Sequence, residues 1–226
     1  MEENGTIPEN IERQYDQIGA QYIREKENYM ATRVSPGMEF ILGHLEDPEH
    51  TALVDVGCGG GEDLLRYQKL GFADLKGVDP SSVMVEVARK RLQNDEMAEL
   101  GSWTHLPFPD ASQDYLVGRS SLHYVGDLDA AYREAARVLK FHGELIIVSP
   151  HPDKSGAVIK KDGREYLQHP VFEGNVLITY PRHSSDEYFS PLFYELFKLL
   201  DRKEYKSSDR PEYIKPDRFA FVARKR

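Results

Sequence analysis

The sequence predicts an α/β fold in which helices cover a mostly parallel sheet. Apolar residues 52–56 run into a glycine-rich turn at 57–61, and a helical pattern begins at residue 62. A second apolar segment ends in Asp79, and another helical pattern follows it. Strands that alternate with helices in this way favour a parallel sheet. Ligands of such sheets bind outside the carboxyl ends of the strands, so we expect the site beside the glycine-rich turn.

Five strands and three helices are expected between residues 52 and 149. The strands are predicted at 52–56, 75–78, 99–103, 114–118 and 144–149, and the helices at 62–70, 82–94 and 128–139. Pro107 and Pro109 mark a turn between the third and fourth strands.

An amphipathic helix is expected near the N-terminus. Apolar residues fall on one helical stripe there: Ile11, Tyr15, Ile18 and Tyr22. Pro8 precedes the stripe and suits the first turn of a helix. A second helix is expected at 37–45.

The character of the chain changes after Pro150. Residues 151–191 are polar and irregular, with one expected strand at 175–180, and long irregular segments in compact domains are usually functional. We therefore predict a cap over the ligand site. Apolar residues at helical spacing predict a last helix at 186–200, and two closing strands are expected near 202–207 and 218–223.

Composition narrows the class of protein. The 226 residues carry a formal net charge of −9, which disfavours nucleic acid as a partner. No apolar run reaches the roughly 18 residues that a membrane span requires, and no signal peptide is recognised, so we expect a cytoplasmic protein without a membrane partner. The one cysteine is compatible with a reducing compartment.

The glycine-rich turn does not match a pyrophosphate site. In the dinucleotide fingerprint a third glycine would stand where this chain has Glu62, which disfavours an NAD-dependent oxidoreductase. The carboxylates of Glu62 and Asp63 at a helix start would repel phosphate. A cofactor that carries an ammonium and a sulfonium but no phosphate suits the turn better, and S-adenosylmethionine is such a ligand.

Four ordered segments resemble the motifs of class I S-adenosylmethionine-dependent methyltransferases. They are VDVGCGGGEDLLR at 54–66, GVDPSSVMVEVARKR at 77–91, HLPFPDASQDYLVGRSSLHYV at 105–125 and REAARVLKFHGELIIVSP at 133–150. The resemblance covers roughly half of the chain and is to the small-molecule type with a domain of the methyltransferase 11 kind. It implies a Rossmann-like sandwich whose seven-stranded sheet has an antiparallel edge strand.

The resemblance also implies one methyltransferase domain over residues 1–226. Residues 1–50 would form an N-terminal helical lid, 51–150 the cofactor-binding core, 151–190 a cap insertion, and 191–226 the last helix and closing strands. Monomer and homodimer both remain open.

The cofactor residues follow from the first two motifs. The resemblance implies that Asp55 contacts the methionine end of the cofactor, although capping of nearby N–H groups is an alternative. Backbone clearance is expected at Gly57, Gly59 and Gly61. Cys58 lies beside them and is expected to pack rather than react.

The second motif supplies the ribose contact. The resemblance implies that Asp79 accepts hydrogen bonds from both ribose hydroxyls, and Pro80 and Ser81 follow it beside the adenine.

Two positions depart from the family pattern. Where the family usually has an acid that accepts from the adenine amino group, Gly101 is followed by Ser102, a weaker acceptor. Trp103 is predicted either to stack on the adenine or to pack in the core. The second departure, Phe141-His142-Gly143 in place of proline-glycine-glycine, concerns a turn remote from the chemistry.

The acceptor side is expected after the fourth strand. Arg119, Ser120 and His123 lie there, Ser120 toward the cofactor and Arg119 toward the acceptor. An imidazole has an ordinary pKa of about 6.5 and suits a general base, so His123 is either the base or a packed histidine. The resemblance implies that Tyr22 could meet His123, and that Tyr15 could close over the cofactor or pack in the core.

The cap contributes the remaining candidates. Tyr180, Arg182 and His183 are close in sequence to Tyr188, and Arg182 could hold a carboxylate or phosphate, although a surface position is an alternative. No metal site is expected.

We therefore predict a methyltransferase that transfers a methyl group from S-adenosylmethionine to O, N or C of a small molecule by in-line displacement. A tRNA-modifying methyltransferase and a non-catalytic cofactor-binding regulatory subunit are the alternatives.

Overall fold

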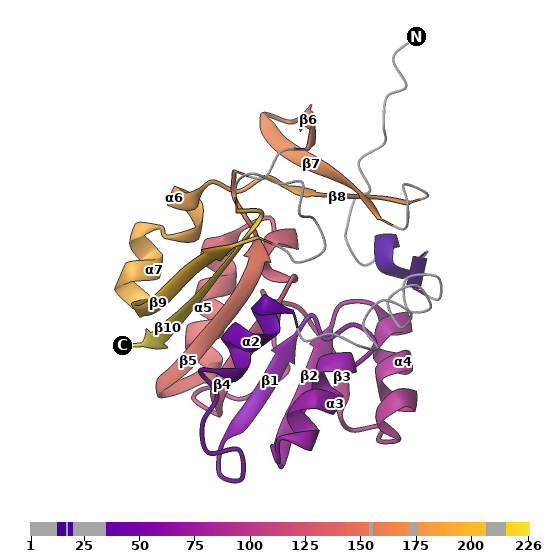
Figure 1. The fold of residues 1–226 in the computed structure, drawn as a ribbon, viewed down its shortest axis with the longest axis vertical. Coiled ribbons are helices and arrows are strands. Elements are labelled where there is room, and N and C mark those ends of the chain that lie inside the picture. The colour runs from indigo at the N-terminus through magenta and orange to yellow at the C-terminus, as the bar shows by residue number, and fades with distance from the viewer. Residues whose placement is uncertain (1–12, 17, 20–34, 154–155, 172–175, 207–215) are drawn as a thin grey trace.

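The computed structural model describes residues 13–16, 18–19, 35–153, 156–171, 176–206 and 216–226. Its central feature is a seven-stranded sheet in the order β3-β2-β1-β4-β5-β10-β9 (Figure 1). The strands are β1 (Ala52–Val56), β2 (Asp74–Asp79), β3 (Ala98–Leu100), β4 (Gln113–Arg119), β5 (Leu139–Pro150), β9 (Phe197–Tyr205) and β10 (Arg218–Lys225). Neighbouring strands from β3 to β5 are parallel, whereas β10 is antiparallel to both β5 and β9. The predicted mostly parallel sheet with an antiparallel edge is confirmed.

Helices cover both faces of this sheet. They are α2 (Pro36–Leu42), α3 (Glu62–Lys69), α4 (Ser82–Leu92), α5 (Leu128–Val138), α6 (Ser185–Tyr188) and α7 (Pro191–Leu196), with a 3-10 turn η1 (Leu122–Tyr124) after β4. Every residue of β1 is buried, as expected for a central parallel strand. Val54 packs with the side chains of α5 and α7, whereas Leu53 packs with those of α2, α3 and α4. Alternate residues of one strand thus serve two hydrophobic cores.

A second, three-stranded antiparallel sheet follows β5, where the sequence predicted one strand. Its strands are β6 (Ala157–Lys161), β7 (Arg164–Val171) and β8 (Val176–Pro181). Asp162 and Gly163 join β6 to β7 with φ values of 51° and 77°. Positive φ at both central residues is the two-residue hairpin turn that an Asp-Gly pair favours.

The predicted helix over residues 186–200 is wrong. Ser190 accepts a hydrogen bond from the backbone N of Phe193 and begins α7 anew, with Pro191 in its first turn. A proline cannot continue a helix from the preceding turn, because it lacks the N–H donor. At Phe197 the chain has already joined the sheet as β9, opposite Lys225 of β10.

Two strand boundaries also differ from the prediction. β3 ends at Leu100, and the following residues form a tight turn in which Ser102 and His105 bridge. The expected turn at residues 141–143 lies inside β5, where His142 adopts a φ of 66° beside a register shift with β4.

The second sheet lies at the end of the large sheet where β1, β2 and β4 have their carboxyl ends (Figure 1). Leu167, Ile178 and Tyr180 of this sheet pack against Tyr15 and Tyr124. Residues 13–16 and 18–19 are helical, as predicted, whereas Ile11 and Tyr22 lie outside the described residues. Within the described part of the chain, no helix combines the length and the apolar character that a membrane span needs.

Candidate functional site

The glycine-rich turn after β1 is fixed to the end of β2. Gly57 and Cys58 donate their backbone N–H groups to the carbonyl oxygen of Val78, at 2.7 and 3.0 Å. Gly57, Gly59 and Gly61 have φ values of 80°, 53° and 80°, which glycine adopts without steric cost.

The three glycines serve different purposes. A Cβ at Gly57 would lie 2.3 Å from Ser121 Cβ, and one at Gly61 would lie 3.2 Å from Ala88 Cβ. These two glycines therefore allow close packing against η1 and α4. At Gly59 no atom of the described residues lies within 4 Å of such a Cβ, so this glycine faces the open edge of the turn, where a ligand can approach the backbone.

Asp79 joins the end of β2 to this turn. The carboxylate is 7% exposed. Its Oδ2 accepts a hydrogen bond from Gly59 N and its Oδ1 accepts one from Ser81 N, each at 2.9 Å. A carboxylate oxygen can accept more than one hydrogen bond, and ribose hydroxyls are donors of the kind that a carboxylate accepts. The residues at this junction fit the adenosine part of S-adenosylmethionine.

The carboxylates at the start of α3 are both paired. Arg91 of α4 donates to Glu62 and to the carbonyl oxygen of Gly60. The guanidinium Nε of Arg119 donates to Asp63 Oδ2 at 2.5 Å. Burial alone would lower the pKa of Arg119, but the Asp63 carboxylate raises it above its ordinary value. Because Glu62 and Asp63 are paired with cations, they repel phosphate less than the sequence alone suggested.

This ion pair also bears on the acceptor side. Arg119 was expected to bind the acceptor, yet its guanidinium pairs with Asp63 in the first turn of α3. Binding of an acceptor by Arg119 stays a prediction.

Asp55 and Cys58 are both buried at the turn. Asp55 is 2% exposed at the end of β1. Burial raises the pKa of the nearby Tyr67 hydroxyl, and the Asp55 charge adds to that effect. Cys58 packs in the hydrophobic core beside Leu64, in agreement with a packing role.

Trp103 belongs to the core. Its Nε1 donates to Ser121 Oγ at 3.1 Å, and Ser121 Oγ donates to the carbonyl oxygen of Val56 at 2.6 Å. A Cβ at Gly118 would lie 2.3 Å from Trp103 Cζ2, so the indole needs a glycine on β4. This geometry favours core packing over stacking on an adenine. Ser102 is half-buried, and its Oγ bonds with Thr104 Oγ1 at 3.2 Å.

Ser120 has a constrained backbone at the carboxyl end of β4. Its φ is 59°, and its N–H donates to the carbonyl oxygen of Val148 on β5 at 2.7 Å. The Oγ accepts a hydrogen bond from Arg218 Nη1 at 3.3 Å, so Ser120 connects β4 to β10.

Three tyrosine side chains from three segments gather around His123. The imidazole centroid lies 4.0 Å from that of Tyr124 and 4.7 Å from that of Tyr180. Tyr15 reaches the group through a hydrogen bond of 2.9 Å between its hydroxyl and that of Tyr124. The structure thus brings the predicted residues His123, Tyr180 and Tyr15 together. Tyr124 was missed, although it adjoins His123 in the sequence.

Arg182 and His183 of the predicted cap have partners outside the group of aromatic residues at His123. Arg182 Nη1 forms an ion pair with Glu165 Oε2 at 3.1 Å. His183 Nε2 donates to the carbonyl oxygen of Val125 at 2.8 Å, and burial lowers its pKa. The ring centroids of His183 and Tyr188 lie 5.6 Å apart, whereas Tyr180 contacts His123 and Arg182 pairs with Glu165. Tyr22, which was expected to meet His123, lies outside the described residues.

Sequence reasoning also missed two polar residues of the N-terminal helix. Asp16 Oδ1 accepts a hydrogen bond from Ser81 Oγ at 2.5 Å. Gln14 bonds twice to Thr179 of β8: Nε2 donates to the carbonyl oxygen and Oε1 accepts from the N–H, each at 3.0 Å. Both residues flank Tyr15, and their position beside it is the only signal for them in the sequence.

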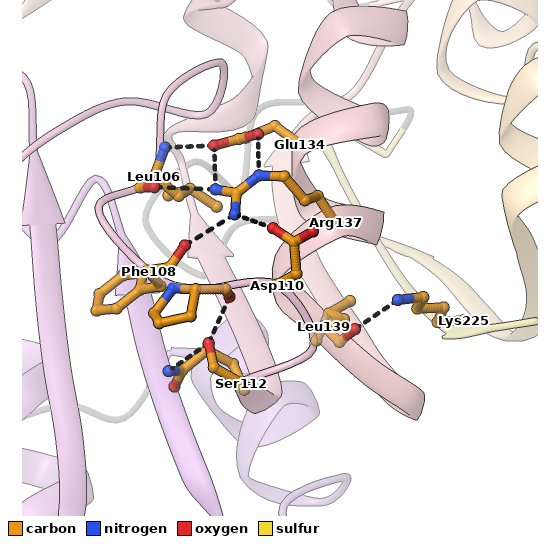
Figure 2. Close-up of polar contacts among 10 residues, drawn as sticks. Leu106, Phe108, Asp110, Ser112, Glu134, Arg137, Leu139 and Lys225 are labelled. Atoms are coloured by element: carbon orange, nitrogen blue, oxygen red, sulfur yellow. Dashed lines mark hydrogen bonds and ion pairs between the residues drawn. The ribbon is translucent and has the colours of Figure 1, made fainter.

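An arginine of α5 holds the loop between β3 and β4. Figure 2 shows Arg137 donating to the carbonyl oxygens of Leu106 and Phe108 and to the carboxylates of Asp110 and Glu134. Glu134 in turn accepts from Leu106 N at 2.8 Å. The loop that follows Ser102 is therefore held at both backbone and side-chain groups.

Comparisons with known proteins give matches to methyltransferases. Residues 54–147 match the family model described as a methyltransferase domain. The chain is 34% identical over 100 residues to a 27-O-demethylrifamycin SV methyltransferase of Amycolatopsis mediterranei, which is 42% of this chain and 37% of that protein. It is also 34% identical over 122 residues to a demethylmenaquinone methyltransferase of Thermotoga maritima, 54% of this chain and 52% of that protein. The chain spans about half the length or less of these curated relatives.

Solved structures extend the likeness of fold to most of the chain. An S-adenosylmethionine-dependent methyltransferase from Mesorhizobium loti superposes with a TM-score of 0.66 at 20% identity, over 83% of this chain and 97% of that one. One from Methanosarcina mazei gives 0.64 at 18% identity, over 86% and 99%. At these identities the likeness shows the fold.

Proposed function

We propose that this chain, which has the class I fold and carries a methyltransferase domain over residues 54–147, is an S-adenosylmethionine-dependent methyltransferase that acts on a small molecule. The observation that carries the proposal is the junction of Gly59 and Asp79. There, a carboxylate at the end of β2 accepts from the backbone of Gly59, the glycine of this turn that faces open space.

S-adenosylmethionine supplies an activated methyl group on sulfur and leaves as S-adenosylhomocysteine. The chain itself has to hold the two reactants in line and exclude water, because alignment provides much of the rate of a displacement. Asp79 and Gly59 would hold the adenosine, and Asp55 would face the methionine end. Methyl transfer to O, N or C of the acceptor is compatible with this arrangement.

His123 is the proposed general base. It is 4% exposed and follows β4 on the carboxyl side of the sheet. Tyr124 and Tyr180 both contact the ring, and these contacts restrict its rotation. A positioned imidazole can remove a proton from a hydroxyl or amine as the methyl group arrives.

A small acceptor is supported by the charge and by the relatives. The net charge of −9 disfavours nucleic acid. The two relatives described above are named for rifamycin and menaquinone precursors. We infer that residues 151–190 form a cap over the acceptor and that residues 1–226 act as one domain with the N-terminal residues as a lid.

The test is methyl transfer. The purified chain is incubated with methyl-labelled S-adenosylmethionine and a panel of small phenols, quinols, amines and activated carbon acids, with transfer RNA as a separate arm. Release of S-adenosylhomocysteine that depends on one class of small molecule supports the proposal. Release that depends only on transfer RNA, or cofactor binding without turnover across all arms, contradicts it.

A further inference from the structure

A carboxylate from the N-terminal helix lies next to the residues that are proposed to hold adenosine. Ser81 is fully buried at the start of α4, and it connects two carboxylates. Its backbone N donates to Asp79 Oδ1, and its side-chain Oγ donates to Asp16 Oδ1 at 2.5 Å across 65 positions of sequence. Asp16 is thereby attached to the same residue that orients Asp79.

The direction of the Ser81 hydrogen bond is determined by its second contact. Ser81 Oγ also accepts from Met84 N at 3.2 Å, as the N-cap of α4. A hydroxyl has a single proton, and a carboxylate can only accept, so that proton goes to Asp16. Hydrogen bonds to ionised acceptors are stronger than neutral ones, which fixes the carboxylate of Asp16 at this place.

After β3 the chain has no acid at the position where the resemblance implied an acceptor for the adenine amino group. Ser102 stands there, and its hydroxyl bonds with Thr104. A hydroxyl therefore stands on the β3 side of the proposed adenosine site, and the carboxylate of Asp16 lies on its N-terminal side.

We propose that Asp16 is a further cofactor-binding residue, which accepts a hydrogen bond from a hydroxyl or amino group of the adenosine. The inference rests on the proposed function. It also has a consequence for the acceptor side, because Gln14, Tyr15 and Asp16 are consecutive. They bond to Thr179 of the second sheet, to Tyr124 of η1 and to Ser81 of α4, respectively. Engagement of Asp16 by the cofactor therefore stabilises the segment that holds the second sheet.

The first experiment is calorimetric titration of S-adenosylhomocysteine into the wild-type chain and Asp16→Asn. The amide can still accept from Ser81 but carries no charge, so we expect about tenfold weaker binding. Asp47→Asn is the control, since Asp47 is an exposed carboxylate that pairs with His50. Equal affinity of Asp16→Asn and wild type overturns the inference, whereas a wild-type chain that does not bind overturns the proposed function itself.

Analogues identify the group that Asp16 accepts from. Versions of S-adenosylhomocysteine without the 2′-hydroxyl, the 3′-hydroxyl or the 6-amino group are titrated into both chains. The proposed role of Asp16 is supported if removal of one of these groups lowers the affinity of the wild type but has little effect on the affinity of Asp16→Asn. Equal penalties in both chains for all three analogues contradict the inference.

A second measurement tests whether cofactor binding at Asp16 stabilises the contact between the N-terminal helix and the second sheet. The amide N–H of Thr179 donates to Gln14 Oε1, so its hydrogen exchange measures the attachment of the N-terminal helix. We expect S-adenosylhomocysteine to slow this exchange in the wild type and in Asp47→Asn, but not in Asp16→Asn. Equal slowing in all three chains would assign Asp16 a purely structural role.

Discussion

Gly59 is the residue at which backbone geometry and ligand access meet. Its left-handed φ of 53° is strained for residues with a side chain, and its missing side chain leaves the edge of the turn open. Gly163 in the β6–β7 turn shares both properties, with a φ of 77° and no neighbour of the described residues within 4 Å of a built Cβ. The two glycines lie in different turns, and Gly59 N also donates to Asp79.

Alanine substitutions at Gly59 and Gly163 distinguish the effect of backbone strain on stability from an effect on ligand binding. Gly59→Ala and Gly163→Ala should each lose about 1–2 kcal/mol of unfolding free energy, because alanine is strained at these φ values. Only Gly59→Ala should weaken binding of S-adenosylmethionine, measured by calorimetry. Normal binding by Gly59→Ala would show that no ligand approaches the turn at this residue.

His123 carries the proposed proton transfer. His123→Asn should lower turnover by about 10²–10⁴-fold, which is the usual contribution of a general base, and should leave cofactor affinity nearly unchanged. His50→Asn serves as the control, because His50 is exposed and lies in the turn before β1. Steady-state kinetics on an active acceptor with parallel calorimetry measure both quantities. Unchanged turnover would make His123 a packing residue.

At the scale of elements, the β3–β4 loop depends on α5. Arg137→Met removes the donors that hold the carbonyl oxygens of Leu106 and Phe108 (Figure 2). We expect a loss of about 2 kcal/mol of unfolding free energy and faster hydrogen exchange over residues 105–112. Arg133→Met, on an exposed position of the same helix, should change neither. Equal exchange in the two variants would show that the loop is held by its own packing.

The sequence predicts those elements whose signals are local. The core strands and α3, α4 and α5 follow from apolar segments and helical spacing, and they match the structure to within a few residues, except for the shorter β3 and the early start of β5. The Asp162-Gly163 hairpin also had a local signal, but the polar composition around it obscured the two strands. Pro191 is likewise a local signal, because proline favours the first turn of a helix. The helical spacing of apolar residues from Phe189 to Leu200 predicted one continuous helix instead, which is wrong.

The site is predictable only in part. Asp79 and the glycine turn are adjacent along two neighbouring strands, so the motifs suffice to bring them together. The contacts of Asp16 with Ser81 and of Arg119 with Asp63 join residues 65 and 56 positions apart. Pairings of that kind depend on how helices pack on the sheet, and no spacing in the sequence specifies them.

At the scale of the whole molecule, polar residues in and just after the second sheet attach it to other described segments of the chain. One of them is His183, which donates from Nε2 to Val125 beside η1. Burial lowers the pKa of His183 below its ordinary value of 6.5. The unfolded chain therefore binds a proton at a higher pH than the folded chain does.

This difference predicts a loss of stability on acidification. The contribution of His183 is fully present above a pH of about 6.5 and declines as the pH falls below that value. His183→Gln keeps a donor for Val125 but does not titrate, so its unfolding free energy should fall less than that of the wild type between about pH 7 and pH 5. Chemical denaturation at both pH values measures this. Parallel losses in the two chains would assign the pH dependence to other groups.

The central claim is that the junction of the glycine turn and Asp79 binds S-adenosylmethionine. Calorimetric titration of the cofactor into the wild type, Asp79→Asn and Asp74→Asn tests it most directly, because Asp74 lies exposed at the opposite end of the same strand. The account predicts saturable binding by the wild type and Asp74→Asn, and a loss of about tenfold or more in Asp79→Asn, since an amide accepts hydroxyl donors less strongly than a carboxylate. Equal affinity of Asp79→Asn and wild type would contradict the account.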